Sequence, residues 1–235
     1  MNKKQKNIRI AILLVVLVFL VYLTIQFFPI FSSLTTEEGR NNFKVVIEGL
    51  GVKGFFVILG LMCIQIIIPF FPGEPIELLA GMCFGSINGL LIILLGIFLS
   101  SVIIISLVKL FGKNFIYTFV KKEKIDKIEN SKFLKNKEKL ELIIFILFIF
   151  PGTPKDILIY IAALLPINTY RFLIISTFAR IPSVISSTIA GDSLVNGNFF
   201  WCIASYVIVF LITAVLIYLL NKKEKNIIKV VNEIK

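Results

Sequence analysis

Two short segments of the chain carry the same helix-breaking, acidic motif. FPGEPIE occupies residues 71–77 and FPGTPKD occupies residues 150–156, and their Phe, Pro, Gly, Pro and acidic positions are in register at a constant offset of 79 residues. Both motifs lie in apolar surroundings, where an ionisable side chain costs about 2.5–3.5 kcal/mol. Glu77 and Asp156 are therefore candidates for binding a polar ligand or for carrying protons.

The other residues of the motif predict how the backbone turns. Gly73 and Gly152 permit a reversal of the chain. The proline two positions later suits the first turn of a helix, and the residue before it, Glu74 or Thr153, is the expected N-cap. Two interpretations remain open: the acids cap half-helices, or the half-helix N-termini bind an anion such as phosphate or carboxylate. The predicted turn residues are Pro72, Gly73, Pro75, Pro151, Gly152 and Pro154.

Arg180 adds a positive charge to this set. Three serines share a helical face with it, at spacings of four, three and four residues. Pro182 removes a backbone hydrogen bond and is expected to kink the helix. Arg180 either faces a cavity or forms a structural ion pair with Asp156 or Glu77, and both alternatives remain open. The cavity-lining candidates are Glu74, Thr153, Lys155, Ser176, Ser183 and Ser187.

The composition indicates an integral membrane protein. The 235 residues are 57% hydrophobic, with a mean hydropathy of +0.95. The net charge of +11 comes from lysines that cluster beside apolar segments, which argues against a nucleic-acid partner. The chain contains no histidine, which excludes imidazole metal sites and Ser-His catalysis. Its three cysteines show no paired spacing and are expected to be reduced; no metal or other cofactor is expected.

The apolar segments predict an all-α polytopic protein. Four of them have about the 20 residues that a span requires. Two more, 54–85 and 140–165, are interrupted by the motifs, which leaves arms of about 10–17 residues that are too short to cross alone. The first span is expected to be retained, because it exceeds a signal-peptide core of about 7–15 residues. The predicted spans are 8–31, 87–111, 168–190 and 199–220.

Charge predicts the orientation of these segments. Basic clusters lie before the first span, within 109–139 and after the last span. The positive-inside rule therefore places all three clusters, and with them both termini, in the cytoplasm of a cell-membrane protein. All three clusters can lie inside only if 54–85 enters and leaves by the outer face and 140–165 enters and leaves by the inner face. The prediction is a pair of re-entrant hairpins of opposite orientation, which is typical of an inverted repeat.

Three regions follow from this plan. Residues 1–53 hold the first span and a helix on the outer surface, which the capping box from Thr35 to Glu38 is expected to begin. Residues 54–220 form a transport domain, and 221–235 form a basic cytoplasmic tail. A further stretch, 121–140, is either an interfacial helix or a solvated linker on anionic headgroups.

The second half of the chain resembles a known family. The segment FPGTPKDILIYIAALLPINTYRFLIISTFARIPSVISSTIAGD is similar to the DedA and VTT-domain superfamily, and most to its SNARE-associated Golgi protein branch, which includes bacterial members. The resemblance covers about 55–220. It implies lipid scrambling or flipping, including undecaprenyl-phosphate recycling, and proton-dependent membrane homeostasis. By matching positions it implies roles for Glu77, Pro151, Asp156 and Arg180.

The chain departs from that family at one point. DedA proteins place arginines around the second hairpin, whereas this chain has Phe148, Ile149 and Lys155. This departure favours a general phospholipid scramblase over an arginine-clamped undecaprenyl-phosphate mechanism. Membrane lipids are accordingly the expected partners, with protons as a candidate coupling ion.

Three other functions remain as alternatives. The first is a proton-coupled carrier of a small anion or osmolyte. The second is an intramembrane enzyme, which the lack of histidine disfavours; Asp192, beside Gly191, is expected to be a cap or loop residue. The third is a scaffold or homo-oligomer in which glycines such as Gly89 and Gly96 allow close helix packing.

Overall fold

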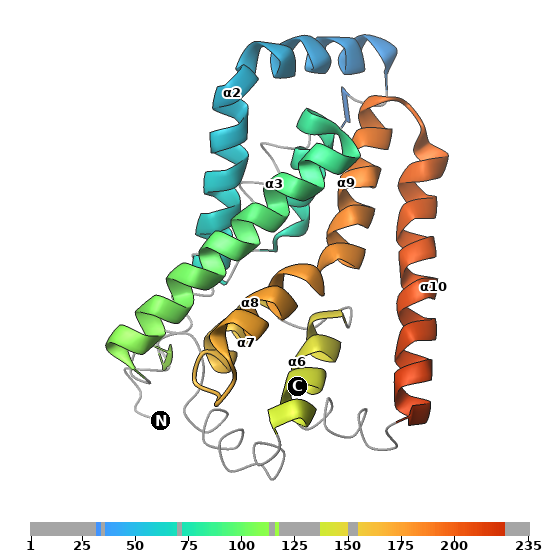
Figure 1. Cartoon of the computed structure of the whole chain (residues 1–235). Helices are drawn as coiled ribbons and strands as arrows, with labels where there is room; N and C mark the ends of the chain where they lie inside the picture. The colour runs from blue at the N-terminus through green and yellow to red at the C-terminus, as the bar shows by residue number, and fades with distance from the viewer. Residues whose placement is uncertain are drawn as a thin grey trace, which may run out of the picture.

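The computed structural model describes residues 32–33, 36–69, 72–112, 116–117, 137–149 and 155–223. Within these ranges the regular structure is entirely α-helical, as predicted. In chain order, the helices are α2 (Glu37–Ile67), α3 (Glu74–Phe111), α6 (Lys137–Ile149), α7 (Lys155–Ala162), α8 (Thr169–Phe178), α9 (Ile181–Val195) and α10 (Phe199–Lys223) (Figure 1).

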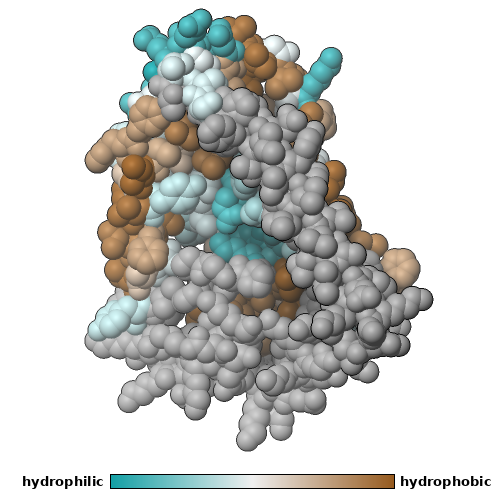
Figure 2. All heavy atoms as spheres, turned by 180° about the vertical axis from the view of Figure 1, so that it is seen from behind, coloured by the Kyte–Doolittle hydropathy of each residue, from teal (hydrophilic) through white to brown (hydrophobic). Residues whose placement is uncertain are grey.

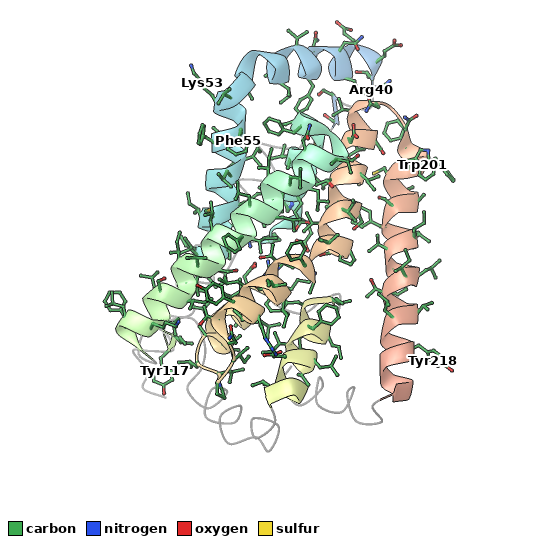
Figure 3. All side chains as sticks on the ribbon, in the orientation of Figure 1. Arg40, Lys53, Phe55, Tyr117, Trp201 and Tyr218 are labelled. Atoms are coloured by element: carbon green, nitrogen blue, oxygen red, sulfur yellow. The ribbon has the colours of Figure 1, made fainter. Side chains whose placement is uncertain are left out.

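Among the described residues, four helical segments are long and apolar enough to cross a bilayer, which makes the chain a multi-pass membrane protein. They are Gly49–Ile67, Glu74–Phe111, Thr169–Val195 and Phe199–Leu216. Large apolar side chains cover the outside of α10, and Trp201 and Tyr218 point outward near its two ends (Figure 3). Aromatic residues are enriched at the two faces of a membrane, so this pattern fits a helix that spans one.

These segments differ in part from the predicted spans. The predicted spans 87–111, 168–190 and 199–220 largely coincide with three of them, whereas 8–31 lies outside the described residues. The fourth, Gly49–Ile67, includes a kink at Gly51. Its straight part, 52–67, agrees with the length predicted for the entering arm of the first hairpin.

Helix α2 is divided by a kink at Gly51. This residue has a φ of +45°, which glycine tolerates and other residues rarely adopt. The part before Gly51 runs across one end of the molecule, and the part after it turns down along α3 (Figure 1). The N-cap is Thr36 rather than the predicted Thr35, because the Thr36 hydroxyl accepts a hydrogen bond from the Gly39 amide at 3.2 Å.

Helix α3 begins at the first motif and folds back on itself at Gly85, where φ is +78°. Its N-cap is Gly73, and Glu74 is already helical, so the prediction of Glu74 as the cap was wrong. After the break, the Asp192 carboxylate accepts hydrogen bonds from the Ser86 amide at 3.1 Å and the Ser86 hydroxyl at 2.6 Å. Asp192 thus caps the second arm of α3, in agreement with its predicted role.

The predicted span 168–190 is two helices rather than one. Helix α8 ends at Phe178 and α9 begins at Ile181, and the two meet at an angle (Figure 1). Pro182 explains the break, because it lacks the N–H that would continue the hydrogen-bond ladder and its ring crowds the preceding turn. Arg180 lies at the junction as the N-cap residue of α9.

Glycines bring α3 and α9 into backbone contact. A Cβ placed on Gly81 would lie 2.1 Å from the Thr188 carbonyl oxygen, and one on Gly191 would lie 2.1 Å from that of Leu78. Two helices can approach this closely only where side chains are missing. The contact holds the first arm of α3, which begins within the first motif, against the helix that follows Arg180.

Candidate functional site

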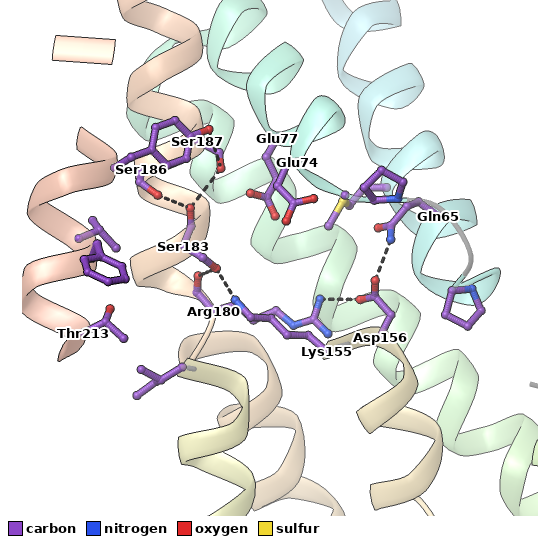
Figure 4. A pocket seen from close by; sticks show the side chains of 18 of the residues that line it. Gln65, Glu74, Glu77, Lys155, Asp156, Arg180, Ser183, Ser186, Ser187 and Thr213 are labelled. Atoms are coloured by element: carbon purple, nitrogen blue, oxygen red, sulfur yellow. Dashed lines mark hydrogen bonds and ion pairs between the residues drawn. The ribbon is translucent and has the colours of Figure 1, made fainter. Parts of the chain in front are cut away.

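A cavity of about 900 Å³ is lined by residues near the ends of α2, α3, α6, α7 and α9 and by the middle of α10. Seen from behind, a hollow with hydrophilic side chains lies midway along the molecule and is bordered by apolar ones (Figure 2). Its polar and charged lining residues are Gln65 of α2, Glu74 and Glu77 of α3, Lys155 and Asp156 of α7, Arg180 at the α8–α9 junction, Ser183, Ser186 and Ser187 of α9, and Tyr206 and Thr213 of α10 (Figure 4).

Arg180 is the central charge of this cavity. Its side chain is only 5% exposed, and its Nη1 donates to Asp156 Oδ1 at 2.7 Å. The guanidinium also lies 5.2 Å from the centre of the Phe148 ring. Its Nε and Nη2 have no hydrogen-bond acceptor among the described residues. A buried donor without a partner costs about 1–3 kcal/mol or more when charged, so these two groups favour an acceptor that enters the cavity.

Asp156 joins the two motif regions. One carboxylate oxygen accepts from Arg180, and the other accepts from Gln65 Nε2 at 2.7 Å (Figure 4). A second link lies close by, where the Tyr160 hydroxyl donates to the Ile67 carbonyl at the end of α2. The last turn of α2 and the helix α7 are therefore held against each other.

Lys155 and Ser183 continue the polar chain. Lys155 Nζ donates to Ser183 Oγ at 2.8 Å, and Ser183 Oγ donates to the Arg180 carbonyl at 3.0 Å. The same carbonyl also accepts from the Val184 amide at 3.0 Å, at the start of α9. The cation of Lys155 is thereby placed beside that of Arg180, on the same side of the cavity (Figure 4).

Glu74 and Glu77 face these cations from the first turn of α3. Acidic side chains are favourable at this position because the helix dipole is positive there. Glu77 lies beside the Ser187 hydroxyl and is close enough to Lys155 and Arg180 for electrostatic interaction. The site thus has an acidic wall on α3 opposite a basic wall formed by α7 and the α8–α9 junction.

A comparison with models of protein families shows which family this chain belongs to. The family model of the VTT domain matches residues 71–193, just over half of the chain. The chain belongs to the VTT domain family. This match confirms the resemblance found in the sequence. No curated protein and no solved structure matches the chain.

The VTT domain contains most of the predicted site residues, and the fold brings many of them together. Those that line the cavity are Pro72, Gly73, Glu74, Glu77, Lys155, Asp156, Arg180, Ser183 and Ser187. Pro75 lies in the first turn of α3 without lining the cavity. Pro151, Gly152, Thr153 and Pro154 lie outside the described residues.

Ser176 does not line the cavity with the other serines. It is fully buried and donates to the Leu173 carbonyl at 3.2 Å. The shared face predicted for Ser176 and Ser183 requires a continuous helix, and the break at Arg180 removes that continuity. Ser176 therefore belongs to the packing of α8.

Several lining residues that the sequence analysis missed lie outside the VTT match. Gln65 precedes the matched segment, and Tyr206 and Thr213 follow it. Gln65 could have been found as the one amide in the apolar run FFVILGLMCIQIIIPF, where a polar group in hydrocarbon is costly. Tyr206 and Thr213 gave no such signal, because hydroxyl residues are common in membrane helices.

Proposed function

We propose that this VTT protein is a membrane lipid transporter, a scramblase or flippase of phospholipid or polyprenyl-phosphate, and a carrier rather than an enzyme. The observation that carries the proposal is the buried guanidinium of Arg180, whose Nε and Nη2 have no acceptor among the described residues and lie in a cavity of about 900 Å³. A lipid phosphate has the charge and the acceptor geometry that such a group binds. The cavity volume is within the range of ligand-binding sites, roughly 300–1,000 Å³.

The apolar side of the cavity supports a lipid over a soluble ligand. Helix α10 contributes side chains that lie between the polar site and the outside of the molecule, Val207, Val209, Phe210 and Leu211. Most of α10 exposes apolar side chains that suit a bilayer. A headgroup in the cavity could therefore keep its acyl chains in the surrounding lipid beside α10.

The same proposal assigns a membrane arrangement to the two motif regions. The turn between α2 and α3 and the ends of α6 and α7 meet at the cavity, and α6 and α7 reach it from the side of the molecule opposite the kink of α2 (Figure 1). We take 54–85 and 140–165 as re-entrant hairpins of an inverted repeat within a transport domain of 54–220, with both termini cytoplasmic. Movement of one hairpin against the other would then open the site to alternate leaflets.

Proton coupling through Glu77, Asp156 and Arg180 completes the proposed mechanism. Asp156 occupies one edge of the Arg180 guanidinium, so protonation of Asp156 would release that edge for a lipid phosphate. Glu77 faces the same cations, so its protonation would change the charge opposite the bound phosphate. The test uses vesicles with an imposed pH gradient. Collapse of the gradient should slow lipid movement by the wild type and leave the residual rate of lipid movement by E77Q unchanged.

A proton-coupled carrier of a small anion or osmolyte is the second candidate. Its support is the number of hydrogen-bonding groups around the cavity, which would also suit a soluble ligand. Reconstituted vesicles separate the two functions. For the lipid transporter, addition of an impermeant quencher should bleach labelled lipid of both leaflets when the protein is present. Solute uptake without any protein-dependent bleaching would support the second candidate and overturn the first.

A further inference from the structure

The charges of the cavity are separated into two groups. Glu74 and Glu77 project from the first turn of α3, whereas Lys155 and Arg180 project from α7 and the α8–α9 junction (Figure 4). We propose that this site takes a zwitterion that carries a phosphate and an ammonium, as in the headgroup of an amine-bearing phospholipid, in preference to a purely anionic headgroup. The inference rests on the proposed function and names the substrate class of that same site.

The basic side of the cavity has free donors for the phosphate. Arg180 is 5% exposed, and its Nε and Nη2 lack acceptors within the described ranges. Lys155 Nζ uses one of its three donors on Ser183. A phosphate placed between them would accept from both cations, and such charge-assisted hydrogen bonds are about twice as strong as neutral ones.

The acidic side has carboxylates for the ammonium. Glu74 and Glu77 are three residues apart in one helical turn, so their side chains share a face. In the described part of the chain neither forms a direct ion pair, whereas Asp156 is paired with Arg180. An ammonium group provides three donors, which is enough to contact both glutamates and the nearby Ser187 hydroxyl.

The overall charge favours the same ligand. The described lining holds three carboxylates, Glu74, Glu77 and Asp156, and two cations, Lys155 and Arg180, which leaves a formal charge of −1. A headgroup with a phosphate alone would make the site more negative, and like charges at short distance repel. A zwitterion leaves the net charge of the site unchanged and can bind to both the acidic and the basic side of the cavity.

The test measures binding of soluble short-chain lipids to the full-length protein in detergent. The unfolding temperature would be followed during titration with dihexanoyl-phosphatidylethanolamine or dihexanoyl-phosphatidylglycerol, which differ in the ammonium. We expect half-saturation at about tenfold lower concentration for the ethanolamine lipid. The variant E74Q/E77Q should lose this preference and still bind the glycerol lipid. The matched control E37Q/E38Q, in the exposed first turn of α2, should keep it.

The outcomes separate this inference from the proposed function. Equal half-saturation of the wild type by the two lipids would overturn the inference, and so would a preference that survives in E74Q/E77Q. A preference found in a protein that moves no lipid in vesicles would support the zwitterion site and overturn lipid transport. Free phosphoethanolamine distinguishes the source of the ligand: binding as tight as that of the short-chain lipid indicates a soluble zwitterion, and much weaker binding indicates a lipid headgroup.

Discussion

Arg180 and Asp156 form a 2.7 Å ion pair between the α8–α9 junction and the first turn of α7. This pair is one of the two roles that the sequence left open for Arg180. The other role, facing the cavity, is left to Nε and Nη2 of the same side chain, which have no acceptor in the described part of the chain. The guanidinium therefore both links two helices and presents donors to the cavity.

Removal of one partner should destabilise the protein more than removal of both. R180A leaves the Asp156 carboxylate without its cation, and we expect a loss of about 3 kcal/mol in the free energy of unfolding. R180A/D156A should lose less, because both charges of the pair are removed together, yet it should move no lipid. Chemical unfolding in detergent and the vesicle assay measure the two effects.

The exposed pair of Arg171 and Glu141, at 3.2 Å, provides the matched control. Because 66% of the Arg171 side chain is exposed, water screens this pair, and R171A should cost less than about 1 kcal/mol. An equal loss of stability in R171A and R180A would contradict the importance of burial at Arg180.

Gln65 is expected to position Asp156 for transport. Q65L removes the 2.7 Å hydrogen bond to the carboxylate, and we expect a loss of about 1.5–3 kcal/mol because the acceptor is charged. Lipid movement should slow even at temperatures where the variant is fully folded. M62L, a change of similar volume at another lining residue, should move lipid at the wild-type rate; a Q65L protein that does the same would refute the positioning role.

The glycine contact of α3 and α9 should tolerate no added methyl group. In G81A the new Cβ would lie 2.1 Å from the Thr188 carbonyl oxygen, which belongs to a helix backbone and cannot move by itself. We expect a loss of about 1–3 kcal/mol in the free energy of unfolding. G60A is the control, since nothing lies within 4 Å of its Cβ and alanine favours a helix by up to about 1 kcal/mol. Equal stability of the two variants would show that the helices are farther apart.

Asp192 is expected to act in folding and not in transport. D192A removes the acceptor of both Ser86 hydrogen bonds, at a cost of about 1 kcal/mol. D192N keeps an oxygen acceptor and should recover part of that stability. Both proteins should move lipid once folded, because Asp192 does not line the cavity. Loss of lipid movement at unchanged stability would assign Asp192 to the site instead.

The depth of the first hairpin can be measured by labelling. With Cys63, Cys83 and Cys202 replaced by serine, single cysteines would be introduced as V52C, G73C and Y170C. Val52 and Tyr170 are 75% and 78% exposed and mark the two expected membrane faces. If 54–85 is re-entrant, an impermeant thiol reagent should label G73C more slowly than either marker. Labelling of G73C from the inner face as fast as that of Y170C would show instead that the segment crosses the membrane.

Local patterns in the sequence determined the class of this protein and several of its site residues. Apolar runs of about 20 residues predict a helical membrane protein, because unpaired backbone groups are too costly in lipid. Acids and an arginine in such runs mark a polar interior for the same energetic reason. Glu77, Asp156 and Arg180 could therefore be selected from the sequence, and the fold brings them to one cavity.

The tertiary structure decided which of these groups touch and which others join them. It pairs Arg180 with Asp156 rather than Glu77, adds Gln65 from α2, and separates Ser176 from Ser183 at the helix break. These contacts join residues 24 to 91 positions apart or depend on the angle between two helices. A periodic pattern specifies only which face of one helix is apolar, and the packing of that face against other helices then determines which polar groups meet.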